Sequence, residues 1–145
     1  MLIAIIGESC TGKSTLADKL KADFNATVYT GKDYLRLAKS PTEAEAVFKK
    51  LLLQSVDGEN VICVISESEH LQLLPESCFK ILVTAPLSVI KERFATRMRG
   101  ILPPPVEAML EKNHGKFDGI QNDFSYKGTE SLEVLKEKIR SFYAD

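Results

Sequence analysis

Residues 7–14 of the chain, with the sequence GESCTGKS, match the phosphate-binding pattern G-x-x-x-x-G-K-[ST]. Gly7 and Gly12 allow backbone conformations and close approaches that a Cβ atom would obstruct. Successive backbone N–H groups then point into one concavity, and a helix beginning near Lys13 adds the positive end of its dipole. We expect nucleotide phosphates to bind to Gly7, Ser9, Cys10, Thr11, Gly12, Lys13, Ser14 and Thr15.

Side chains within this loop have separate expected roles. Lys13 is expected to reach the β- and γ-phosphates of ATP, Ser14 to ligate Mg²⁺, and Thr15 to support the α-phosphate side. Cys10 has two interpretations: it is a redox-sensitive thiol near a helix N-terminus, or a small side chain that the loop tolerates.

A second group of polar residues follows the apolar run VICVIS, at residues 61–66. Many phosphate-loop enzymes place Asp at such a strand end, whereas this chain has Ser66 and Glu67. Glu67 is a candidate to hold Mg²⁺ through water or to orient an acceptor, because Mg²⁺ prefers oxygen ligands and keeps several waters. The alternative is that these residues form a polar loop with no role in binding.

Apolar runs and helical periodicity alternate along the chain, which predicts βαβ units. We expect strands at residues 2–6, 26–30, 60–66, 80–85 and 120–126. We expect helices at residues 13–22, 33–38, 42–55, 87–98, 106–114 and 130–143. The fold class is therefore α/β, a three-layer α/β/α P-loop NTPase fold with a mostly parallel five-stranded sheet. Ligands of such sheets bind beyond the carboxyl ends of the strands, which is where the glycine-rich loop lies.

Size and composition limit the function classes. The 145 residues predict one domain, 1–145. The net charge of −1 argues against an extended nucleic-acid interface. No stretch approaches the roughly 20 apolar residues of a membrane span. The three cysteines are odd in number and lack metal-ligand spacing, which favours a reducing cytoplasm. We expect a monomer or a small homo-oligomer.

Three segments give the chain a resemblance to the P-loop nucleoside monophosphate kinases and their shikimate-kinase-like relatives: GESCTGKST, YTGKDYLR (29–36) and KERFATRMRG (91–100). The second is similar to the T-G-D-x-L-R segment of adenylate kinases, with one extra residue between Gly31 and Asp33. The resemblance implies that Thr30 and Arg36 hold the acceptor and that residues 121–128 pass the donor base.

The third segment resembles the R-x-x-x-R start of the lid in these kinases. Arg93 and Arg97 are one helical turn apart, and Arg99 follows just beyond. Because phosphoryl transfer spreads negative charge over the moving oxygens, arginines on a mobile segment can stabilise it when substrate is present. We expect a short lid at about residues 98–118, with Arg93 and Arg97 catalytic and Arg99 binding substrate. The alternative is a solvated basic helix face.

These features predict an ATP-dependent small-molecule kinase that transfers the γ-phosphoryl group of Mg·ATP to a nucleoside monophosphate or a similar small acceptor. A shikimate-like kinase acting on a metabolite hydroxyl is the alternative within enzymes. The resemblance then gives Asp33 the role of binding or activating that hydroxyl, whereas its other interpretation is a helix N-cap. A non-catalytic ATP-binding regulatory module is the alternative outside enzymes.

Overall fold

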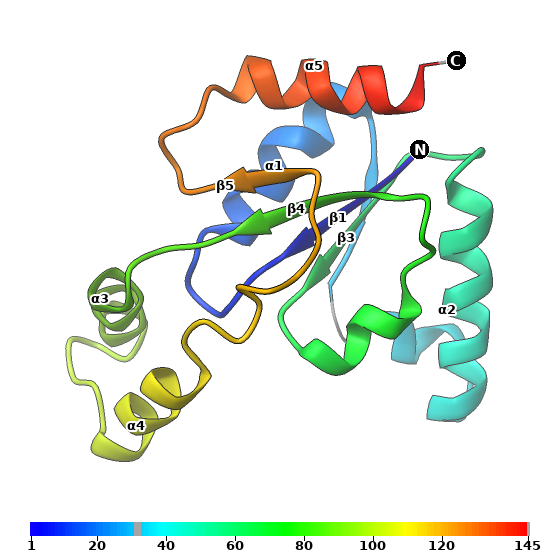
Figure 1. The fold of residues 1–145 in the computed structure, drawn as a ribbon. Coiled ribbons are helices and arrows are strands. Elements are labelled where there is room, and N and C mark those ends of the chain that lie inside the picture. Colours follow the sequence, from blue (N-terminus) through cyan, green and yellow to red (C-terminus); the bar gives the residue numbers. More distant parts are fainter. Residues whose placement is uncertain (31–32, 145) are drawn as a thin grey trace.

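The computed structural model describes residues 1–30 and 33–144, which form a five-stranded sheet flanked by helices (Figure 1). The strands lie in the order β2-β3-β1-β4-β5, and every neighbouring pair is parallel. Their carboxyl ends therefore meet at one edge of the sheet. The strands are β1 (Leu2–Ile6), β2 (Thr27–Tyr29), β3 (Val61–Ile65), β4 (Phe79–Val83) and β5 (Phe124–Tyr126).

Helices connect the successive strands, and a further helix follows the last strand. The α-helices are α1 (Lys13–Phe24), α2 (Pro41–Ser55), α3 (Leu87–Arg97), α4 (Pro104–Asn113) and α5 (Leu132–Tyr143). Helices α1 and α5 cover one face of the sheet and α2 covers the other. Two 3₁₀-helices, η1 (Asp33–Leu37) and η2 (Ser68–Leu73), follow β2 and β3. None of the helices within residues 1–30 and 33–144 has the length and apolar character that crossing a membrane requires.

The sheet is buried on both faces, which explains why its central strands read as unbroken apolar runs. Ile3 and Ile5 of β1 face a core formed with α1 and α5, whereas Leu2, Ala4 and Ile6 face a core formed with α2 and η2. The expected three-layer α/β/α architecture with a parallel sheet is confirmed. Figure 1 shows α1 and α5 on one side of the sheet and α2 on the other.

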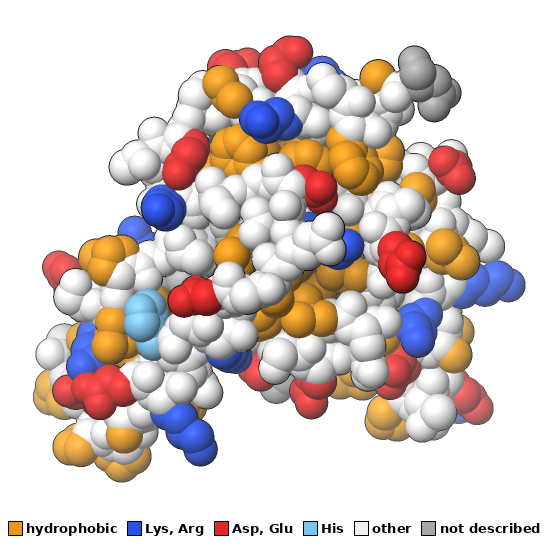
Figure 2. All heavy atoms as spheres, in the orientation of Figure 1, with side chains coloured by type: hydrophobic (Ala, Val, Ile, Leu, Met, Phe, Trp, Pro, Cys, Tyr) orange, Lys and Arg blue, Asp and Glu red, His pale blue; other side chains and the backbone are white. Residues whose placement is uncertain are grey.

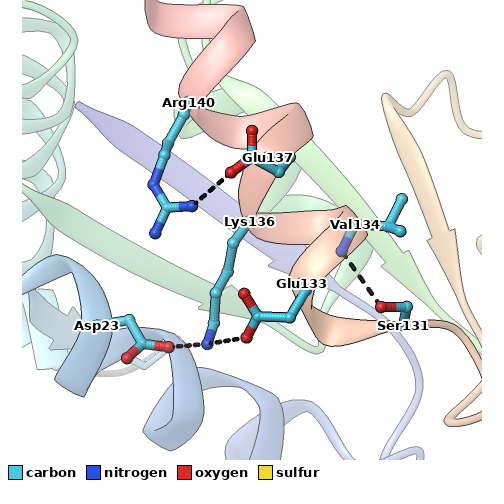
Figure 3. A network of polar contacts seen from close by, with 7 residues as sticks. All are labelled: Asp23, Ser131, Glu133, Val134, Lys136, Glu137 and Arg140. Atoms are coloured by element: carbon cyan, nitrogen blue, oxygen red, sulfur yellow. Dashed lines mark hydrogen bonds and ion pairs between the residues drawn. The ribbon is translucent and has the colours of Figure 1, made fainter.

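A polar contact also joins the two helices of the first layer (Figure 3). Lys136 of α5 pairs with Asp23 of α1 and, at 3.3 Å, with Glu133 of its own helix. Hydrogen bonding to Asp23 raises the pKa of Lys136. Because α1 begins at the glycine-rich loop, this contact helps to hold α5 against the helix that carries the loop.

The α3–α4 pair packs beside the carboxyl edge of the sheet rather than over either face (Figure 1). Ile90 of α3 and Leu110 of α4 are buried together with Cys10 of the glycine-rich loop. Apolar atoms also lie on the surface of this region (Figure 2), where Met98, Ile101 and Met109 are exposed. The small apolar core therefore fixes the α3–α4 pair directly to the loop.

Several element boundaries differ from the sequence expectations. Helix α4 begins at Pro104 instead of residue 106, because proline is well suited to the first turn of a helix, where its missing N–H leaves no bond unmade. Strand β5 spans three residues instead of seven, and residues 33–37 form a 3₁₀-helix. The helix η2 was not predicted, since its polar residues have no clear helical periodicity.

Candidate functional site

The glycine-rich loop turns sharply from β1 into α1. The Gly7 N–H donates to the Ile65 carbonyl at 3.1 Å, and a Cβ atom on Gly7 would lie 2.5 Å from the Val83 carbonyl oxygen. Cys10 and Gly12 have left-handed backbone conformations, with φ values of 64° and 101°. Gly12 is also the N-cap of α1, so the free N–H groups of the first helical turn face the carboxyl edge of the sheet. The open glycine backbone and the free N–H groups at the start of α1 are the features that the motif uses to bind a phosphate group.

Lys13 is almost fully buried at the base of this loop. Its ammonium group donates to the Glu8 carbonyl oxygen at 2.5 Å, and the Thr11 hydroxyl donates to the same oxygen at 2.8 Å. Burial lowers the pKa of Lys13 to about 8, and the nearby charges of Lys116 and Arg97 act in the same direction. An arriving anion would remove this penalty, because it favours the charged form of the ammonium group.

Two cavities open on the loop. The larger has a volume of about 530 Å³ and lies between the start of α1, the end of α3 and the segment after β5. Its basic residues come from these different elements. They are Lys19, Arg93, Arg97 and Lys127. A cavity with this size and charge can accept a nucleotide.

The smaller cavity has a volume of about 220 Å³ and lies toward the ends of β2 and β3. Lys13 and Arg97 supply its positive charge. Most of its other polar side chains are hydroxyl groups, from Ser9, Ser14, Thr15, Thr30 and Ser66. Cys10, Gly12, Thr15 and Arg97 line both cavities, so the two spaces meet at the loop.

The two arginines of α3 differ in their contacts. Arg93 donates from Nη1 to the Cys10 carbonyl oxygen at 3.0 Å. It lines the larger cavity and not the smaller one. Arg97 is exposed and lies where the cavities meet. Arg99 lies just beyond the helix with a positive φ of 65°, is exposed and lines neither cavity. The structure therefore brings Arg93 and Arg97 to the loop and leaves Arg99 outside it.

The predicted acceptor residues are likewise divided. Thr30 lines the smaller cavity, whereas Arg36 is exposed and lines neither cavity. Asp33 accepts hydrogen bonds from the backbone N–H of Thr30 at 2.7 Å and from its hydroxyl at 2.9 Å, and these bonds lower the pKa of Asp33. Asp33 thus binds back to Thr30, the last described residue before it. The extra residue of the T-G-D-x-L-R comparison, between Gly31 and Asp33, lies outside the described residues.

Glu67, the expected carboxylate for Mg²⁺, is exposed and lines neither cavity, although Ser66 before it lines the smaller one. A carboxylate oxygen of Glu67 lies 3.9 Å from the Lys116 ammonium. Within the described part of the chain, no group of three or more His, Cys, Asp or Glu residues is placed to hold a metal ion. Mg²⁺ usually needs only one or two protein carboxylates beside waters and substrate phosphates.

Sequence analysis missed the contact made by the Glu8 side chain. Glu8 is buried, with one carboxylate oxygen 3.1 Å from His114 Nδ1 and the other accepting the Gly115 N–H at 3.0 Å. Glu8 occupies a variable position of the phosphate-binding pattern, and His114 lies 106 residues away. No local signal in the sequence relates them.

Comparison with known proteins identifies the fold. Neither a family profile nor a curated protein sequence matches this chain. Among solved structures, it is similar to a sugar kinase from a Janibacter species, with 15% identity and a TM-score of 0.64 over 97% of this chain and 92% of that one. It is also similar to shikimate kinase from Bacteroides thetaiotaomicron, with 12% identity and a TM-score of 0.62 over 97% of this chain and 95% of that one.

A further similar structure is the YorR protein of Bacillus subtilis, solved in complex with phosphorylated GDP. It has 18% identity and a TM-score of 0.63 over 100% of this chain and 99% of that one. Each of these structures is similar over nearly the full length of both chains. The chain therefore has the fold found in small-molecule kinases.

Proposed function

We propose that the chain is an ATP-dependent small-molecule kinase, with the nucleotide in the larger cavity and the acceptor in the smaller one. The observation that carries the proposal is the junction of the two cavities at the glycine-rich loop, with Arg97 lining both. A phosphoryl group that passes between bound donor and acceptor must cross such a junction. Catalysis of this transfer depends mainly on positioning and on neutralising charge.

The loop residues support the donor half of the proposal. Lys13, which lines the smaller cavity beside the loop, would release the Glu8 carbonyl oxygen and bind the β- and γ-phosphates where the two cavities meet. Lys19 and Lys127 add positive charge around the larger cavity, which would hold the rest of the nucleotide. Mg²⁺, when bound, would neutralise the phosphate charge; the Ser14 hydroxyl would hold it, and Glu67, which lines neither cavity, would act only through a bound water.

The smaller cavity supports a hydroxyl-bearing metabolite as the acceptor. Its volume of about 220 Å³ suits a small polyol or hydroxy acid better than a whole nucleoside monophosphate, and Thr30 and Ser66 supply hydroxyl groups that lie outside the phosphate-binding loop. A nucleotide acceptor would also need cations for its own phosphate. Arg36, the candidate for that task, is exposed and lines neither cavity.

Asp33 is poorly suited to removing a proton from the acceptor. Its lowered pKa makes the carboxylate a weak base, and one of its oxygens already accepts two hydrogen bonds from Thr30. The loose transition state of phosphoryl transfer requires little help from a base. We propose that Asp33 instead holds Thr30 in its place beside the smaller cavity through these two hydrogen bonds.

Replacement of Arg97 tests the proposal. ADP release from Mg·ATP would be measured with shikimate, gluconate, other small polyols and the nucleoside monophosphates as acceptors. Arg97→Ala should lower kcat by about 100-fold or more, with the KM for ATP changed by less than about fivefold, because the guanidinium acts mainly on the transition state. Arg140→Ala on α5 is the control, since Arg140 is exposed and pairs with Glu137.

An acceptor-independent ADP release, or equal activities of the two arginine variants, would contradict the kinase. Tight ATP binding with no turnover for any acceptor would support the regulatory module instead. Stimulation by nucleoside monophosphates alone would keep the kinase and overturn the choice of acceptor.

A further inference from the structure

Glu8 places a negative charge inside a loop that has the geometry to bind anions. Such a charge repels phosphate and weakens its binding. A carboxylate at this position therefore calls for a structural role that offsets the repulsion. Glu8 is only 8% exposed, so the carboxylate is also removed from most of the solvent. Buried carboxylates are costly unless they are paired and hydrogen-bonded. The contacts of Glu8 indicate what it does.

Both carboxylate oxygens of Glu8 contact the residues that follow α4. One lies beside the His114 ring, and the other accepts the backbone N–H of Gly115. Gly115 has a left-handed φ of 81°, which turns the chain back toward the sheet. The carbonyl oxygen of the same Glu8 accepts the Lys13 ammonium. A single residue thus contacts the buried lysine and the end of the α3–α4 region.

The residues after this contact run along the carboxyl edge of the sheet (Figure 1). Lys116 lies 3.9 Å from Glu67, which follows β3, and its charge helps to lower the pKa of Lys13. Phe117 is buried in the core on the α2 side of the sheet. The segment His114–Phe117 therefore begins at its contact with Glu8. Lys116 in its middle lies beside Glu67, and Phe117 at its end is buried in the core.

We propose that Glu8 is a positioning residue, whose carboxylate fixes the segment His114–Phe117 against the glycine-rich loop and so places the Lys116 charge on the acceptor side of the site. This inference rests on the proposed kinase. Lys116 lines neither cavity. It lies 3.9 Å from Glu67, which follows Ser66 of the smaller cavity, and its positive charge acts on Lys13. Glu8 acts through this segment and does not touch substrate.

Two substitutions of Glu8 separate its hydrogen bonds from its charge. Glu8→Ala removes both contacts, whereas Glu8→Gln keeps an oxygen for the Gly115 N–H and an amide that can donate to neutral His114. With the acceptor that gives the fastest ADP release, Glu8→Ala should lower kcat roughly 10- to 100-fold and change the KM for ATP less than about threefold. Glu8→Gln should retain kcat to within about threefold.

A second variant keeps the inference testable if Glu8→Ala fails to fold. His114→Ala leaves the loop sequence intact, and its exposed side chain makes unfolding of the chain a small risk. It should lower kcat less than Glu8→Ala does. The double variant should match Glu8→Ala alone, because the His114 ring contributes only through its contact with the Glu8 carboxylate, which Glu8→Ala already removes. Hydrogen exchange at the Gly115 amide should accelerate in Glu8→Ala and stay slow in Glu8→Gln.

The outcomes separate this inference from the proposed function. If the wild-type chain shows no acceptor-dependent turnover, the kinase is contradicted, while Gly115 exchange still decides whether Glu8 holds the segment. If the wild type turns over and Glu8→Ala keeps its kcat, the positioning role is overturned. Additive effects of the Glu8 and His114 changes, or equal losses in Glu8→Ala and Glu8→Gln, would overturn it as well.

Discussion

Lys13 is buried at the position where a phosphate is expected to bind, so nucleotide binding should change the protonation of its ammonium group. Burial lowers its pKa to about 8, so the free protein holds a substantial neutral fraction of Lys13 in mildly alkaline solution. Phosphates favour the charged form and raise the pKa in the complex. Nucleotide binding above pH 8 must therefore take up a proton.

The sign of the resulting pH dependence is fixed by linkage. The Kd for Mg²⁺ and a non-hydrolysable ATP analogue should be constant below about pH 7.5 and should rise by up to about tenfold per pH unit above pH 8. Titration calorimetry from pH 7 to 9.5 in buffers of different ionisation heat would measure both the Kd and the proton uptake.

Lys13→Arg is the matched control, because a guanidinium stays protonated over this range. Its Kd, whatever the absolute value, should not change with pH. A flat profile in the wild type, or the same slope in Lys13→Arg, would show that Lys13 does not titrate on binding.

Individual residues differed in how far the sequence could predict them. The glycine-rich loop was predictable because its backbone geometry demands fixed residue types at fixed spacing. The position of Arg97 was predicted from the resemblance of residues 91–100 to the R-x-x-x-R lid start, together with its spacing of one helical turn from Arg93. Glu8 was not predictable, since its contact with His114 arises only when the segment after α4 folds back to the loop. The roles assigned to Arg36, Glu67 and Arg99 stay predictions.

At the scale of elements, α5 is attached to the edge of the sheet opposite the candidate site. The Tyr143 hydroxyl accepts the N–H groups of Leu2 and Phe79, each at 3.2 Å, and donates to the Leu2 carbonyl oxygen. It thus joins the first residues of β1 and β4. Burial raises the pKa of Tyr143 to about 12, so the hydroxyl stays protonated at neutral pH.

Tyr143→Phe should therefore lower stability without changing catalysis. Loss of the hydroxyl leaves two backbone N–H groups without their partner, which costs about 1 to 3 kcal/mol. Chemical denaturation would measure the free energy of unfolding, and kcat should stay unchanged. Tyr34→Phe is the control, since the Tyr34 hydroxyl makes no hydrogen bond to the described residues. Equal stability of the two variants, or a lower kcat in Tyr143→Phe, would contradict this role.

The elements themselves were largely predictable because both outer layers bury a periodic apolar face and the central strands are buried on both sides. The exceptions were short. Strand β5 lies at the edge of the sheet, and η1 and η2 are short 3₁₀-helices whose formation depends on tertiary contacts such as the stacking of Tyr34 on Phe48. Such contacts leave no periodic signal in the sequence.

At the scale of the whole molecule, all five strands direct their carboxyl ends to one edge, and the α3–α4 pair lies beside that edge. Two cavities of unequal size meet there. In the proposed reaction this asymmetry would give a nucleotide and a smaller acceptor separate places, with Arg97 between them. One domain, a monomer or small homo-oligomer, and a cytoplasmic location stay predictions from the sequence.

The fate of the γ-phosphoryl group of ATP decides whether the chain transfers it to a small acceptor. The wild-type chain would be incubated with Mg²⁺, ATP labelled in the γ-phosphate, and the panel of small polyols, hydroxy acids and nucleoside monophosphates, with Lys13→Ala as the blank. We expect the label to appear in a small hydroxyl-bearing acceptor with the wild-type chain and not with Lys13→Ala. Label found only in inorganic phosphate, or retained entirely in ATP with every acceptor, would contradict the proposed transfer.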